Sequence, residues 1–174
     1  MGTPTNTNFA RRYSRSFDVV TPQSFTSPFF FMAAATTGSA GQVVKYGATE
    51  DTVEIAGLNA TRYQVAGFLQ QDVKDLDAGP VKGYRNLNNT VANLGDPVGV
   101  LQGFGVAFTK IYSGTPAVGQ TLTSAANGYL LTGVASGIDV LAVVEAVTSS
   151  ISPSKEPAQT AAAAGNNYIR IRII

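Results

Sequence analysis

The end of the chain carries its clearest hydrophobic pattern. In residues 168–174, YIRIRII, isoleucines at 169, 171 and 173 alternate with Tyr168, Arg170 and Arg172. Successive side chains of a strand point to opposite faces. The pattern therefore predicts a strand whose isoleucines face a core, with the tyrosine and both arginines facing outward.

Similar short segments recur along most of the chain. Each is bounded by Gly, Pro, Asn or Asp, the residues that favour turns. The expected strands are 42–46, 52–56, 62–69, 97–102, 105–112, 120–123, 129–132, 141–147 and 168–174. Many short strands with frequent turns and little helix predict an all-β fold, a small β-barrel or sandwich.

Two of these segments predict more than their strand character. Residues 141–147, LAVVEAV, are mostly apolar on both faces, which indicates a central strand. Gly67 interrupts segment 62–69, and a glycine inside a strand indicates a bulge or a close backbone approach. Regular alternation would place Tyr63, Val65, Gly67 and Leu69 on one face, and Gln64, Ala66 and Phe68 on the other.

Residues 1–28 have no such pattern and predict an extended N-terminal arm ahead of a β-barrel domain at 29–174. The arm is polar and contains three prolines, so it cannot bury enough apolar surface by itself to offset the entropy lost on ordering. Four aromatic residues are candidate anchors for another surface, either a neighbouring subunit, which we favour, or the chain's own barrel. They are Phe9, Tyr13, Phe17 and Phe25.

The arm also holds a small basic cluster, Arg11, Arg12 and Arg15. Three arginines are few for nucleic-acid binding, because each neutralised phosphate adds only one increment of affinity. We expect these residues to pair with acidic groups of a protein partner.

Residues 70–94 predict a long loop, with one or two helical turns at its start. A loop of this length in a compact domain is usually functional or flexible, and we take Tyr84 and Arg85 as candidate partner contacts. The carboxylates at Asp72, Asp75 and Asp77 suggest a calcium loop, but the terminal Glu of that motif is missing. We therefore expect a solvated turn and no metal.

The amino-acid composition limits the reactions and ligands that are possible for this chain. Of the 174 residues, 13% are charged, about half of the usual ~25%, and the formal net charge is +1. His, Cys and Trp are absent, which excludes His-based acid–base relays and the usual zinc sites. The chain has no apolar run of ~18 residues for a membrane span. We expect a protein that is not an enzyme and needs no cofactor, membrane or nucleic acid.

The segments GDPVGVLQGFGVAFT (95–109) and VGQTLTSAANGYL (118–130) give the chain its resemblance to a known family. They resemble the capsid decoration, or cement, proteins of tailed bacteriophages, and the resemblance extends over roughly residues 40–148. It implies a small β-barrel that forms a homo-oligomer, often a trimer. It also implies a structural virion protein, made in the host cytoplasm, that binds the major capsid protein and bridges neighbouring capsomers to stabilise the head. The family has no catalytic residues to carry over.

A second interpretation remains open, a glycan- or host-surface-binding β-domain on the virion. Exposed tyrosines and amides are common in such sites, and this chain places Tyr84 beside Asn86, Asn88 and Asn89. The absence of Trp weighs against it.

Overall fold

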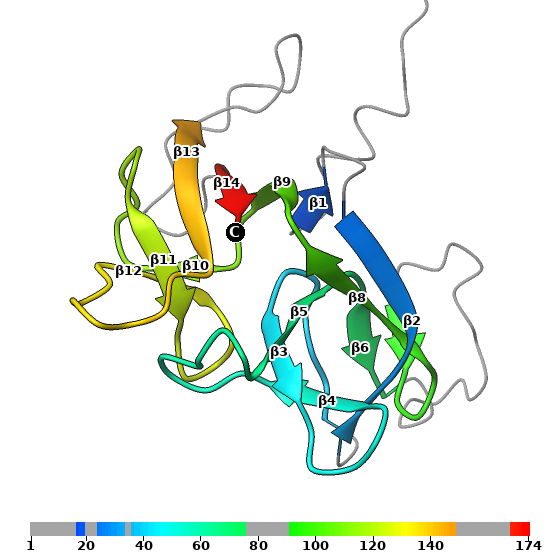
Figure 1. Cartoon of the computed structure of the whole chain (residues 1–174). Helices are drawn as coiled ribbons and strands as arrows, with labels where there is room; N and C mark the ends of the chain where they lie inside the picture. The colour runs from blue at the N-terminus through cyan, green and yellow to red at the C-terminus, as the bar shows by residue number, and fades with distance from the viewer. Residues whose placement is uncertain (1–16, 20–23, 34–35, 76–90, 149–167) are drawn as a thin grey trace, which may run out of the picture.

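The computed structural model of the chain describes residues 17–19, 24–33, 36–75, 91–148 and 168–174, and these form a nearly all-β structure (Figure 1). The described residues contain fourteen strands. The first seven are β1 (Phe17–Val19), β2 (Ser24–Met32), β3 (Val43–Tyr46), β4 (Thr52–Ile55), β5 (Val65–Leu69), β6 (Asp72–Lys74) and β7 (Val91–Asn93). The others are β8 (Val98–Gly103), β9 (Gly105–Thr109), β10 (Tyr112–Ser113), β11 (Thr121–Ser124), β12 (Leu130–Thr132), β13 (Ala142–Thr148) and β14 (Tyr168–Ile173).

The strands form three sheets. Five close into a barrel in the order β2-β4-β3-β5-β8, and seven form an open sheet in the order β1-β9-β14-β13-β11-β12-β10. A small parallel pair, β6 and β7, completes the set. In Figure 1 the barrel lies below and the seven-stranded sheet above, and the chain passes between them from β8 to β9. The prediction of an all-β fold with a barrel is confirmed.

The last strand follows its predicted pattern except at its first residue. The three isoleucines of β14 are buried, and Arg170 and Arg172 are exposed. Tyr168 was expected to face outward but is only 9% exposed. The Nζ of Lys110, from the residue after β9, lies 4.2 Å from the centre of its ring, so a neighbouring chain segment covers the tyrosine. The interior position predicted for 141–147 is confirmed, because β13 pairs with β11 and β14.

Segment 105–112 does not form one strand as predicted. β9 ends at Thr109, and the short β10 begins at Tyr112 on the far edge of the same sheet. The hydroxyl of the buried Thr109 accepts a hydrogen bond from the backbone N–H of Ile111 at 2.9 Å. This local bond replaces a ladder bond and turns the chain.

The predicted arm and the predicted loop both contain strands. β1 pairs with β9, and β2 fills the barrel between β8 and β4, so the boundary at residue 28 is wrong and falls inside β2. Within 70–94, the predicted helical turn is also wrong, because residues 72–74 form β6 and pair with β7. Short strands of three residues carry too few positions for a period to be read from sequence.

Two clusters of buried side chains make up the core. One contains residues from all five barrel strands, among them Val44, Val53, Leu69 and Val100. The other joins barrel residues such as Val43, Phe68 and Leu101 to residues of the seven-stranded sheet, including Leu122, Val144, Ile169 and Ile171. Neighbours along β3 and β8 belong to different clusters because successive strand residues face opposite sides. One face of the barrel therefore packs against the sheet.

Candidate interaction surface

A hollow opens where the barrel meets the seven-stranded sheet. Its volume is about 240 Å³. The barrel lines it with Val65–Phe68 of β5 and with Leu101 and Gly103 of β8. The sheet lines it with Leu141, just before β13, and with Ile173 and Ile174 at the end of β14. The side chains of the lining are thus mostly apolar, although much of the exposed lining surface is polar, and they come from distant parts of the sequence.

Arg62 supplies the polar side chain of the hollow. It lies in the turn before β5, and its backbone N–H donates to the Asp139 carboxylate at 2.7 Å. The preceding N–H, of Thr61, donates to the Gln64 side chain at 3.2 Å. These contacts fix the backbone of the turn, so Arg62 stands on an ordered support.

The segment before this turn is fixed from β11. The hydroxyl of Ser124 accepts a hydrogen bond from the Ala60 N–H at 2.8 Å and donates one to the Gly57 carbonyl at 2.7 Å. The Ser124 carbonyl also accepts from the Asn59 N–H at 2.8 Å. One buried serine therefore holds both ends of a four-residue segment in which Asn59 adopts a positive φ of 54°.

One exposed aromatic side chain lines the hollow, and another directly follows the lining residue Arg62 in the chain. Phe104, at the junction of β8 and β9, lines it and is 63% exposed. Tyr63 follows Arg62 in the chain and is 93% exposed. Gly103, with φ of +94°, makes the turn that presents Phe104, and a Cβ added at Gly103 would have no atom within 4 Å apart from those of its two chain neighbours. Exposed aromatic residues and arginine are the types that dominate binding energy at protein interfaces.

The charged side chain in the lining of the hollow, Arg62, forms no ion pair with another described residue. None of the ion pairs between described residues includes Arg62; those pairs join Lys45 to Glu54, Lys74 to Asp72, and Arg170 and Arg172 to Glu145. The carboxylate of Asp139 receives the backbone N–H of Arg62 but does not line the hollow. The guanidinium is therefore available to a carboxylate from outside.

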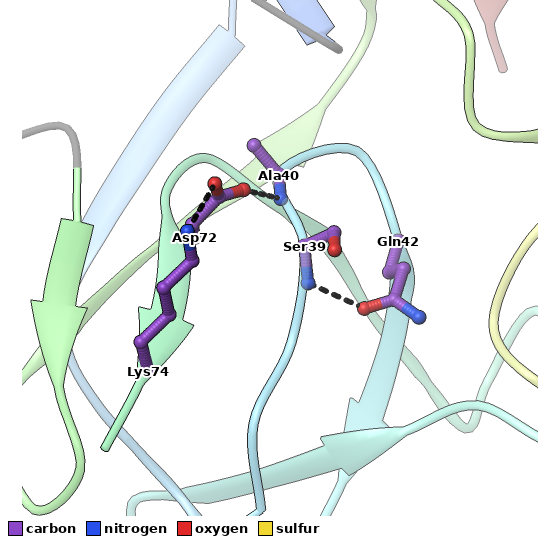
Figure 2. Close-up of polar contacts among 5 residues, drawn as sticks. All are labelled: Ser39, Ala40, Gln42, Asp72 and Lys74. Atoms are coloured by element: carbon purple, nitrogen blue, oxygen red, sulfur yellow. Dashed lines mark hydrogen bonds and ion pairs between the residues drawn. The ribbon is translucent and has the colours of Figure 1, made fainter. Parts of the chain in front are cut away.

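The candidate metal ligand Asp72 has a structural role instead. Its Oδ1 accepts the N–H of Ala40 at 2.9 Å, and its Oδ2 lies 3.9 Å from Lys74 Nζ (Figure 2). In the same view Gln42 accepts the N–H of Ser39 at 2.6 Å. The expected solvated turn is replaced by a strand that fixes the chain before β3. Within the part of the chain that the structure describes, no three His, Cys, Asp or Glu residues are grouped to hold a metal.

Most partner-contact residues predicted from the sequence lie outside the described residues. These are Phe9, Arg11, Arg12, Tyr13, Arg15, Tyr84 and Arg85. The two that are described belong to strands. Phe17 is paired in register with Thr109, and Phe25 with Gln102.

Sequence reasoning missed Arg62 and Phe104. Phe104 stands between two glycines, Gly103 and Gly105, and a large apolar residue at a glycine turn is a signal of exposure that could have been used. Nothing in the sequence around Arg62 indicates the hollow, because part of its wall comes from residues more than seventy positions away, such as Leu141 and Ile173.

A comparison with models of known protein families finds no match, and a comparison with curated protein sequences finds none either. Among the described residues there is no helix of sufficient length and apolarity to cross a membrane.

Proposed function

We propose that the protein is a structural virion protein that binds the capsid surface and bridges neighbouring capsomers, as the cement proteins it resembles do. Its partner in this proposal is the major capsid protein, and the protein acts as a homo-oligomer, with a trimer favoured. It works at the capsid surface after synthesis in the host cytoplasm. No reaction, cofactor or nucleic acid is part of the role.

The observation that carries the proposal is the pair of exposed rings, Phe104 and Tyr63, on a rigid β-framework. Phe104 and Arg62 both line the hollow between the barrel and the sheet, and Tyr63 follows Arg62 in the chain. Side chains of these types concentrate binding energy when a partner excludes water from them. A bridging protein needs such anchors on a support that does not deform, and several weak anchors in an oligomer multiply affinity through effective concentration.

The N-terminal segment supplies a second contact in this proposal. Residues 1–16 precede β1, an edge strand of the seven-stranded sheet, and they contain two of the four aromatic residues of the predicted arm and all three arginines of its basic cluster. We expect a variant lacking residues 1–16 to lose most of its binding to empty capsids of the same virus, measured by co-sedimentation. Its far-UV circular dichroism and thermal unfolding should match those of the full chain.

A longer deletion provides the contrast. A variant lacking residues 1–28 also loses β1 and half of β2, which is needed to close the barrel between β8 and β4. We expect it to lose cooperative unfolding, so its loss of binding carries no information about the arm. Full capsid binding by the folded variant that lacks only residues 1–16 would contradict the role proposed for those residues. Failure of the full chain to bind capsids would contradict the proposed function itself.

The hollow does not favour the alternative of glycan binding. Of the described residues that line it, Arg62 is the one with a polar side chain, whereas a sugar needs several placed polar groups to satisfy its hydroxyls. The residues on which that alternative was based, Tyr84, Asn86, Asn88 and Asn89, lie outside the described part of the chain. Binding of the isolated protein to a glycan array would favour it.

A further inference from the structure

The hollow has the size and lining of a receptacle for one side chain. At about 240 Å³ it is smaller than the ~300–1,000 Å³ of typical small-molecule sites. Two of its lining residues are joined by a hydrogen bond, because the Ile174 N–H donates to the Leu141 carbonyl at 3.2 Å. Phe68 and Leu101, two of its wall residues, are almost fully buried. A bulky apolar side chain would exchange water for aliphatic contact on several sides.

Arg62 adds a positive charge to the hollow, which limits the kind of partner that fits it. Among the described residues, the lining includes one cationic side chain, that of Arg62, and no carboxylate side chain. A guanidinium that pairs with no described carboxylate, beside apolar walls, favours an anionic neighbour for the apolar group. The ordered turn under Arg62 means that little backbone entropy is lost when such a pair forms.

We propose that this hollow receives a bulky apolar side chain of a protein partner that carries a carboxylate residue next to it in sequence. The apolar group enters between Phe104 and the aliphatic walls, and the carboxylate pairs with Arg62. This deepens the proposed function by stating the chemistry of the contact on the capsid protein. It can be tested without capsids.

The test uses three capped tetrapeptides as probes, Gly-Phe-Asp-Gly, Gly-Phe-Asn-Gly and Gly-Phe-Lys-Gly. Each is titrated into the ¹⁵N-labelled full chain while the amide signals of Gly67, Gly103 and Phe104 are followed by NMR. We expect saturable shifts at these amides with the Asp peptide, with a dissociation constant of ~1–10 mM for so small a contact. The Asn peptide should bind about three- to fivefold more weakly, as expected for loss of an exposed ion pair, and the Lys peptide more weakly still.

Two variants and a control localise the effect. Arg62→Gln should abolish the preference for the Asp peptide over the Asn peptide. Phe104→Ala should weaken the binding of all three peptides. Arg170→Gln, which changes an exposed arginine paired to Glu145 on β14, should leave every titration unchanged. If no peptide shifts these amides, or if all three shift them equally, the proposal is wrong.

The peptide titrations and the capsid-binding assay test different claims, so either one can fail without the other. Wild-type protein that binds capsids, with Arg62→Glu binding equally well, would leave the proposed function intact but exclude the hollow as its contact. Peptide preference without any capsid binding would support the receptacle and contradict the virion role.

Discussion

Ser124 and Thr123 are neighbours on β11, and both are buried, but their hydroxyls are in opposite situations. Ser124 is 0% exposed and bonds both to the Ala60 N–H and to the Gly57 carbonyl. Thr123 is 1% exposed, and its hydroxyl has no hydrogen-bond partner among the described residues. A buried polar group without a partner costs stability, whereas a satisfied one contributes modestly and is expensive to remove.

This contrast predicts opposite effects of removing the two hydroxyls. Ser124→Ala leaves the buried Ala60 N–H and the partly buried Gly57 carbonyl unpaired, so we expect it to lower the free energy of unfolding by ~2–4 kcal/mol. Thr123→Val removes an unpaired group with little change of shape and should leave that free energy unchanged or raise it by up to ~1 kcal/mol. Urea denaturation of both variants measures the difference, and equal destabilisation would contradict the hydrogen-bond assignments.

For single residues, the sequence predicted burial and exposure correctly where a residue's environment depends on its position in its own strand. The isoleucines of β14 are buried and its arginines exposed, as their alternation predicts. Tyr168 was misplaced because its cover comes from Lys110, almost sixty positions earlier. Arg62 could not be singled out because its significance depends on walls contributed by β8, by Leu141 just before β13, and by the end of β14.

At the scale of elements, Gly67 is the position that decides the shape of β5. The pairing of β3 with β5 shifts register between Val44 and Lys45, so the predicted irregularity at Gly67 is confirmed. Its consequence was not foreseen, because the shift interrupts the strict alternation. Val65 and Phe68 pack in one core cluster, and Ala66 and Leu69 in the other. An extra residue in one strand reverses the facing of everything beyond it.

We therefore predict that Gly67→Ala is strongly destabilising. Gly67 has φ of +149°, and an added Cβ would overlap the carbonyl oxygen of Leu101 in β8. We expect a loss of at least ~3 kcal/mol, from backbone strain and displacement of the neighbouring strand. Gly119→Ala is the matched control, because Gly119 also has a positive φ, +83°, but open space around the added atom. It should lose only ~1 kcal/mol, and equal losses in chemical denaturation would argue against the close approach of β5 and β8.

On the scale of the whole molecule, the barrel and the seven-stranded sheet share a core. Phe68 and Leu101 of the barrel belong to the same cluster as Leu122 and Ile169 of the sheet. Neither sheet could separate without exposing these side chains to water, which costs roughly 25 cal/mol per Å² of apolar surface. The chain also crosses between them within a few residues, at Phe104.

This arrangement predicts a single cooperative unfolding transition. In differential scanning calorimetry we expect one peak, with a van't Hoff enthalpy close to the calorimetric enthalpy. Leu101→Ala should move the whole peak to lower temperature, because it removes contacts from the shared cluster. Two peaks, or a shift of only part of the heat absorption, would show that the barrel and the sheet unfold independently.

The sequence by itself determined that this protein is built of short β-strands, which segments form most of them, and that β13 is interior. Those properties depend on the local alternation of apolar and polar residues, on turn residues and on apolar content, all of which can be identified in the sequence. Only the tertiary structure decided that residues 17–32 and 72–74 join sheets, how Gly67 reverses the facing of β5, and that Arg62 and Phe104 meet at one hollow. Each of these depends on backbone pairing or side-chain packing between residues far apart in sequence, and no local pattern records such contacts.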